Sequence, residues 1–257
     1  MFLQKTFKLF VLLAVSCLLL SCNSLGKSEN EKLISGKEEY YTIDPATLMN
    51  ATNQENKEGL FILRTPFADQ SEMWSLPEEK TVYWEQNDYY QVAKTLNEYL
   101  GNEPLENWGI KYVILDNDCV DAGYGFARGS FKFFKIASSA KGGSRAVMTM
   151  DIQPWRKITR VYSAVYSPVI EKWTSLDFEK VKISARQAFE IAEKNGGSDA
   201  RSKVENKCFV SVSMLAPGSG YNWIVRYTVS NEKIGPNTIY EVLVDSRDGK
   251  FQVVSLP

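Results

Sequence analysis

Runs of alternating apolar and polar residues, grouped in the same order twice, constrain the fold of this 257-residue chain most strongly. In each half, apolar residues at helical spacing are followed by four runs with the period of a β-strand. Each half also has one cysteine near its first strand, Cys119 and then Cys208. We predict an α+β fold of two helix-plus-antiparallel-sheet units, interpreted as diverged tandem copies. The alternative is one continuous sheet with helices on one face.

The first unit is predicted over residues 59–175. Asn87 or Asp88 is placed to cap a helix that runs to Leu100, and Gly101 follows its predicted end. Runs rich in β-branched and aromatic residues predict strands before and after this helix. They cover residues 60–63, 81–84, 111–115, 125–136, 145–152 and 157–166.

The second unit is predicted over residues 176–257. Ser184, followed three residues later by Gln187, is the signature of a capping box at the start of a helix. The glycines at 196 and 197 are expected to end that helix. Strands are predicted over residues 208–214, 221–230, 238–245 and 250–254. Gly249 is expected to adopt a positive φ in the last hairpin.

The second unit resembles PepSY (peptidase propeptide-like) domains, which are small cystatin-like modules of one helix and an antiparallel sheet. The resemblance covers roughly Lys182 to Val254 and is carried by residues 182–185, 188, 192, 223–227, 240–245 and 248–250. It implies a protein that binds or restrains other proteins, peptidases especially. It assigns a catalytic role to none of these residues. The expected working surface is the exposed sheet face or a hairpin edge.

The N-terminus has the pattern of an export signal. Lys5 and Lys8 precede an apolar run of about 12 residues, which is shorter than the roughly 20 residues that span a bilayer. Residues 19–22 resemble the lipobox of bacterial lipoprotein precursors. This resemblance implies a signal peptide over residues 1–21 and a lipid-modified Cys22, with palmitate among its acyl chains. The alternatives are a cleaved signal peptide in which Cys22 is incidental, and a signal-anchor helix.

Residues 22–58 are predicted to be a lipid-anchored flexible tether, because few large apolar residues precede Tyr40. Asn23, in place of Asp, resembles the outer-membrane sorting pattern of two-membrane bacteria. The expected location is therefore the cell envelope, at the outer membrane if the cell has two membranes. Multiple acylation would make the attachment stable.

The absence of histidine limits the chemistry of this chain. Ser-His-Asp and Cys-His nucleophile systems and metal sites that need imidazole are excluded. Removal of the leader takes away two of the 30 basic residues and none of the 31 acidic ones, so the remaining chain is weakly acidic. Such a charge argues against nucleic-acid binding.

Four cysteines leave one pairing to consider. Cys17 lies in the leader and Cys22 would carry lipid, so Cys119 and Cys208 remain. In an oxidising compartment, two such thiols form a disulfide. The alternative is that each is buried separately as a small apolar side chain.

Aromatic residues gather before and within the first predicted helix. Trp74, Trp84, Tyr89 and Tyr90 are candidates for a platform that binds a sugar or peptide. The alternative is that these rings fill the core.

Acidic residues suggest two further sites. Asp116, Asp118 and Asp121 are followed by Gly123, which suggests either a calcium loop or a simple turn. Val120 and Ala127 occupy positions where an EF-hand has ligands. A pair drawn from these aspartates and Glu241 could instead serve a hydrolase.

These features together predict a membrane-anchored, non-catalytic lipoprotein that binds or inhibits a peptidase or another envelope protein. No cofactor, metal or nucleic acid is expected. The alternatives are a lipoprotein with an aromatic-lined ligand site and a carboxylate-based envelope hydrolase.

Overall fold

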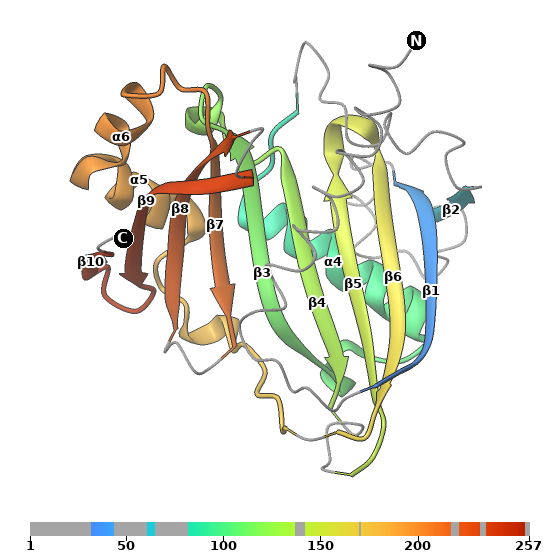
Figure 1. The fold of residues 1–257 in the computed structure, drawn as a ribbon. Coiled ribbons are helices and arrows are strands. Elements are labelled where there is room, and N and C mark those ends of the chain that lie inside the picture. The colour runs from blue at the N-terminus through green and yellow to red at the C-terminus, as the bar shows by residue number, and fades with distance from the viewer. Residues whose placement is uncertain are drawn as a thin grey trace.

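The fold is a ten-stranded sheet with helices packed on one side (Figure 1). The computed structural model describes residues 32–43, 61–64, 82–136, 142–169, 171–216, 221–231 and 235–254. Neighbouring strands are antiparallel, in the order β10-β9-β8-β7-β3-β4-β5-β6-β1-β2. The strands are β1 (Lys32–Ile43), β2 (Phe61–Arg64), β3 (Trp108–Asp118), β4 (Arg128–Lys135), β5 (Arg145–Gln153), β6 (Ile158–Ser167), β7 (Phe209–Leu215), β8 (Asn222–Asn231), β9 (Gly235–Asp245) and β10 (Phe251–Val253).

The α-helices are α4 (Gln86–Gly101), α5 (Ala185–Ala192) and α6 (Ser198–Ser202). A π-helical turn, η7 (Glu193–Gly197), joins α5 to α6. The short 3-10 helices are η2 (Leu105–Asn107), η3 (Ala122–Tyr124), η5 (Pro154–Arg156) and η6 (Phe178–Lys180).

Helix α4 begins slightly earlier than predicted. Glu85 is its N-cap, and Asp88 accepts a hydrogen bond from the Glu85 backbone N–H at 2.9 Å, so the two form a capping box. The helix therefore starts at Gln86, and neither Asn87 nor Asp88 is the cap. Asn102, in the left-handed conformation with φ of 48°, follows its last residue.

Helix α5 begins as predicted. The Ser184 hydroxyl accepts from the Gln187 N–H at 3.2 Å, and the Gln187 side chain accepts from the Ser184 N–H at 2.8 Å. The predicted stop at the glycines is only partly correct. Gly196, with φ of 116°, interrupts the regular helix, and the chain continues helically into α6.

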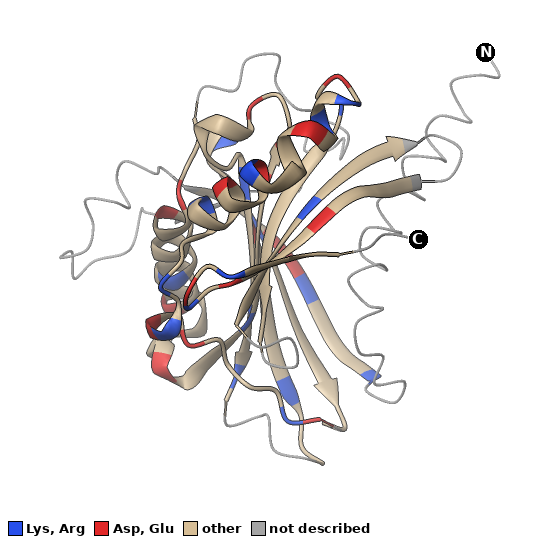
Figure 2. Cartoon of the chain, turned by 90° about the vertical axis from the view of Figure 1, so that its left-hand side faces the viewer, with Lys and Arg blue, Asp and Glu red and all other residues tan. Residues whose placement is uncertain are grey.

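Both long helices pack on the same face of the sheet, as the edge-on view shows (Figure 2). We call this the helix face. Alternate strand residues point toward it and are nearly inaccessible, among them Val113, Phe131 and Met150 beneath α4, and Val212, Trp223 and Val242 on the α5 side. The opposite surface, to which Asp116, Arg128 and Asp151 belong, is the outer face. Among the described residues, no helix covers it.

The predicted division into two separate units is wrong. Strand β7 pairs with β3, joining residues 209–215 to residues 112–118 in one register. The predicted units, 59–175 and 176–257, are therefore two parts of one sheet. The physical reason is that each part alone would leave the edge of β3 or β7 with unpaired backbone groups, and mutual pairing satisfies both. The arrangement agrees with the alternative of one continuous sheet.

The tether prediction is wrong for residues 32–43. These form β1, which pairs with β6 from Lys32 opposite Ser167 to Thr42 opposite Ile158. Tyr40 and Tyr41 are buried, and pairing offsets the ordering cost that the polar composition suggested. The predicted signal peptide, Cys22 and residues 44–58 lie outside the described residues. None of the helices that the structure describes is long and apolar enough to cross a membrane.

A disulfide between Cys119 and Cys208 closes one end of the β3–β7 junction. The Cys119 backbone N–H also donates to the Cys208 carbonyl at 2.9 Å. Both residues are buried. The bond therefore links the two predicted units where they meet.

Candidate binding surface

A line of polar side chains crosses the outer face, and we call it the polar row. Consecutive strand pairings place Glu241 opposite Arg226, Arg226 opposite Ser211, and Ser211 opposite Asp116. The row continues through the next four strands. Its members from β9 to β1 are Glu241, Arg226, Ser211, Asp116, Arg128, Asp151, Arg160 and Tyr40.

Ion pairs connect the β4, β5 and β6 members of the row, and Glu38 connects Arg160 to Tyr40 on β1. Arg128 Nη2 lies 3.3 Å from Asp151 Oδ1, and Arg160 Nη1 lies 4.0 Å from Asp151 Oδ2. Arg160 Nε also contacts Glu38 Oε1 at 2.8 Å, and the Tyr40 hydroxyl donates to the same Glu38 oxygen. Opposite charges on neighbouring strands stabilise the sheet register.

The other side of the row contains one ion pair. Arg226 Nε contacts Glu241 Oε2 at 2.5 Å across β8 and β9. Ser211, on β7, has no charge and separates this pair from Asp116. The row therefore alternates in charge on both sides of an uncharged position.

Asp116 is the carboxyl group of the row whose pKa is clearly altered. Burial raises its pKa to about 6, and Asp151 acts in the same direction, although Arg128 opposes the increase. The Arg128 guanidinium is held in its charged form by Asp151 and Asp116. The carboxyl of Asp116 therefore gains a proton within a mildly acidic range.

Partly buried apolar side chains flank the row on both sides of the junction. They alternate with inward-pointing core residues along β3, β7, β8 and β9. They are Tyr112, Ile114, Leu215, Ile224 and Leu243. Phe209, at the start of β7, is 49% exposed. Aromatic, aliphatic and arginine side chains on one face are typical of surfaces that bind proteins.

A second cluster covers the opposite end of the outer face. Trp173 packs edge-on against Phe134 at 5.5 Å between ring centroids, and Arg145 stacks on the Trp173 ring at 3.8 Å. Lys111 and Lys132 lie 5.1 and 5.4 Å from that ring. Burial and the nearby Arg145 lower the pKa of Lys111. This end of the outer face therefore gathers three basic side chains around one tryptophan ring.

The predicted aromatic platform does not form one surface. Trp84 and Tyr89 are core residues on the helix side, and the Tyr89 hydroxyl donates to the Phe126 carbonyl at 2.8 Å. Tyr90 is partly buried and packs on Phe178 at 5.1 Å. Trp74 lies outside the described residues. The core interpretation therefore holds for Trp84 and Tyr89.

The predicted carboxylates are only partly brought together. Asp116 and Asp118 occupy alternate positions of β3, so both belong to the outer face, about 7 Å apart along the strand. The Asp121 side chain accepts a hydrogen bond from Tyr83. Asp116 and Glu241 belong to the same row, but three strand spacings separate them, or about 14 Å. Asp116 and Glu241 therefore cannot act together on one bond.

The loop proposed for calcium is organised by protein groups. Asn117 Nδ2 donates to the Asp121 carbonyl at 2.9 Å and to the Gly125 carbonyl at 2.7 Å. Among the described residues, no group of three or more His, Cys, Asp or Glu side chains is arranged to hold a metal ion. The turn interpretation accounts for these contacts.

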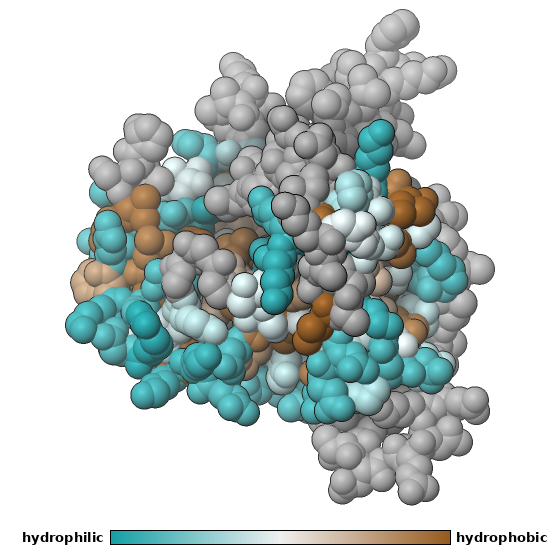
Figure 3. All heavy atoms as spheres, turned by 90° about the horizontal axis from the view of Figure 1, so that it is seen from below, coloured by the Kyte–Doolittle hydropathy of each residue, from teal (hydrophilic) through white to brown (hydrophobic). Residues whose placement is uncertain are grey.

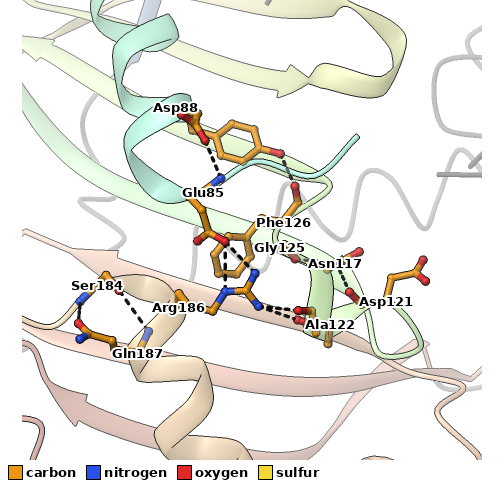
Figure 4. A network of polar contacts seen from close by, with 12 residues as sticks. Glu85, Asp88, Asn117, Asp121, Ala122, Gly125, Phe126, Ser184, Arg186 and Gln187 are labelled. Carbon is orange, nitrogen blue, oxygen red and sulfur yellow. Dashed lines mark hydrogen bonds and ion pairs between the residues drawn. The ribbon is translucent and has the colours of Figure 1, made fainter. Parts of the chain in front are cut away.

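Arg186 connects this loop to both long helices (Figure 4). Its guanidinium contacts Glu85 Oε1 at 2.7 Å, and Nη1 donates to the Gly123 carbonyl at 3.1 Å. Beside it, the Ala185 N–H donates to Gln86 Oε1 at 2.9 Å. The starts of α4 and α5 are therefore joined on the helix face, behind the β3–β7 junction.

Sequence reasoning identified Asp116 and Glu241 but missed the arginines that accompany them. Arg128, Arg160 and Arg226 each occupy an alternate position of a predicted strand, so they point away from the core. The alternation of polar and apolar residues along these strands is the feature of the sequence that could have identified the three arginines. Their assembly into one row follows only from the strand order.

Comparisons with protein-family models, with curated proteins and with solved structures find no match to this chain.

Proposed function

We propose that this chain is a membrane-anchored, non-catalytic module that binds another envelope protein through its outer face. The acylated Cys22 implied by the lipobox resemblance would supply the anchor, and the resemblance to PepSY domains favours a peptidase as partner. The single observation that carries the proposal is the polar row with its apolar flanks.

The composition of the outer face supports a protein partner. Alternating charges in fixed positions select among partners, because a partner with the opposite order of charges would bring like charges together. Half-buried tyrosine, leucine and isoleucine side chains supply apolar contact. The row belongs to regular strands, so its side chains are held in one arrangement.

Crosslinking in cells tests where the partner docks. A photoreactive phenylalanine analogue is placed at Ser213 or Ile224 on the outer face and, as the control, at exposed Glu190 on α5. The proposal expects one adduct of the same mass from both outer-face positions and not from Glu190. Equal adducts from all three positions, or adducts from Glu190 alone, would refute it.

A charge exchange then tests the row. In the double variant Arg226→Glu with Glu241→Arg, the ion pair is kept but its direction is reversed. We expect unchanged thermal stability with at least about tenfold weaker partner binding, because the partner then faces reversed charges. Unchanged binding of the partner would show that the polar row is not part of the interface.

The anchor is tested separately. Labelled palmitate should be incorporated into the wild-type chain and not into Cys22→Ala, which should leave the membrane fraction. Labelling of Cys22→Ala with palmitate would show that the lipid is attached to another residue.

A further inference from the structure

A small groove lies on the helix face, at the end of the sheet where β3 begins. It has a volume of about 250 Å³. Its lining combines three aromatic side chains (Tyr90, Trp108 and Phe178) and three acidic ones (Glu106, Asp177 and Glu179) with three aliphatic side chains and one serine. Figure 3 shows the molecule from this end, where hydrophilic and apolar residues lie side by side on the surface.

Four separate elements build the groove. Tyr90 comes from α4, Glu106 from η2, Trp108 from β3, and Phe178 from η6. The Leu176 N–H donates to the Ile110 carbonyl at 2.8 Å, which fixes the segment leading into η6 against β3. The walls are therefore set by the fold and not by one loop.

The aromatic walls are held in place by packing. The Tyr90 and Phe178 rings lie 5.1 Å apart. Burial, together with Glu98, raises the pKa of Tyr90, so its ring stays neutral. Aromatic rings present a partial negative charge on their faces, which attracts cations.

The charge of the lining is one-sided. None of the described residues that line the groove is basic. Asp177 caps η6 by accepting from the Glu179 N–H at 3.1 Å and pairs with Lys180 at 3.0 Å. Glu106 and Glu179 are exposed. The groove therefore has an interior of aromatic and aliphatic side chains and an acidic rim, in which Lys180 already offsets the charge of Asp177.

We infer that this groove binds an organic cation, either a quaternary or a primary ammonium group. Aromatic rings with nearby carboxylates are the chemistry that recognises such a group, because the rings tolerate its alkyl surface and both features favour its charge. The volume suits one small amine or one lysine side chain and is below the range typical of drug-sized ligands. The groove lies on the opposite side of the sheet from the polar row, so the inference does not depend on the proposed function.

Calorimetric titration with choline tests the charge requirement. Its neutral carbon analogue, 3,3-dimethylbutan-1-ol, has nearly the same shape and provides the matched control. We expect choline to saturate the full chain in the millimolar range and the analogue to bind at least about fivefold more weakly. Equal affinity of the two, or no saturation by about 100 mM choline, would overturn the inference.

Variants test the site itself. Glu106→Gln with Glu179→Gln should weaken choline binding about fivefold or more and leave the neutral analogue unaffected. The control Glu190→Gln, an exposed carboxylate on α5, should change choline binding less than about twofold. Phe178→Leu should weaken choline binding about threefold, because it removes a ring from the wall. Choline affinity that is unchanged in the first variant, or equally reduced in the control, would refute the assignment.

A final comparison distinguishes the two sources of the cation. N-acetyl-lysine methylamide represents a lysine side chain of a protein, and choline represents a free amine. Tighter binding of the lysine compound assigns the groove to a peptide, and tighter binding of choline assigns it to a small molecule. Failure of both compounds to compete with each other would refute a shared site.

Discussion

Removal of the disulfide should destabilise the chain because the bond closes a long loop. Cys119 and Cys208 are 89 residues apart in sequence, with Cα atoms 5.3 Å apart. Both side chains are buried at the end of the β3–β7 junction. The double variant Cys119→Ala with Cys208→Ala removes the bond without adding a buried polar group.

The expected loss follows from the loop length. For a loop of 89 residues, the chain-entropy relation gives about 4.6 kcal/mol at 25 °C. Removal of native disulfides typically costs about 2–5 kcal/mol, so the expected free energy of unfolding falls by an amount in the upper part of that range. Such a change is a large fraction of the stability of an ordinary domain.

The assay is equilibrium unfolding in urea, followed by tryptophan fluorescence, on a chain that starts at Asn23. In this chain Cys119 and Cys208 are the only cysteines. The oxidised wild type should unfold at a higher urea concentration than the double variant, and the reduced wild type should agree with the variant. A loss of free energy below about 1 kcal/mol would refute the reasoning from loop closure.

Three other perturbations test the packing and electrostatics. Gly129→Ala would place a Cβ 2.4 Å from the Tyr89 ring, and the overpacking should cost about 1–3 kcal/mol in a thermal melt; Gly123→Ala, which has no atom within 4 Å of the added Cβ, is its control. Asp116 has a pKa raised to about 6 by burial, so the folded state binds its proton more tightly than the unfolded state does. The free energy of unfolding should therefore fall as the pH rises from about 4 through about 6, by at most about 3 kcal/mol. Urea titrations at several pH values should show this pH dependence in the wild type and not in Asp116→Asn. Full retention of the dependence in Asp116→Asn would contradict the assignment to Asp116. Asn117→Ala removes two hydrogen bonds to loop carbonyls and should cost about 1–3 kcal/mol in urea unfolding, whereas a change near zero would show that water replaces them.

Local sequence patterns predicted most of the elements. The helix at 86–101, the capping box of α5, and strands such as β5 and β8 agree with the alternation of apolar and polar residues. These elements follow from short-range physics, namely which face is buried and which side chain caps a helix. Pairing between β3 and β7 depends on residues nearly a hundred positions apart, and no local pattern specifies it.

The error at β1 has a physical explanation. Its charged residues, Lys37, Glu38 and Glu39, gave the composition of a spacer. In the sheet, Lys37 and Glu39 pair with each other at 2.6 Å, and Glu38 pairs with Arg160. A strand close to the sheet edge can keep a polar sequence because its backbone hydrogen bonds, and not its side chains, order it.

The candidate site was predictable only in part. Asp116 is a candidate from its spacing to nearby aspartates, but the polar row around it is formed with Ser211 and Arg128 on the neighbouring strands. The groove shares only Tyr90 with the predicted aromatic group. Both surfaces gather residues from separate elements, so tertiary structure was needed to find them.

The two strands that end the sheet are much shorter than the strands beside them. Strand β10 pairs only with residues 242–244 of β9, and β2 pairs only with residues 40–43 of β1. Within the described residues, most of β9 and β1 therefore has no strand on the side away from the sheet centre. Backbone groups along such a margin can pair with a strand from another chain, so the two margins, unlike the wide faces, are where this sheet can be lengthened.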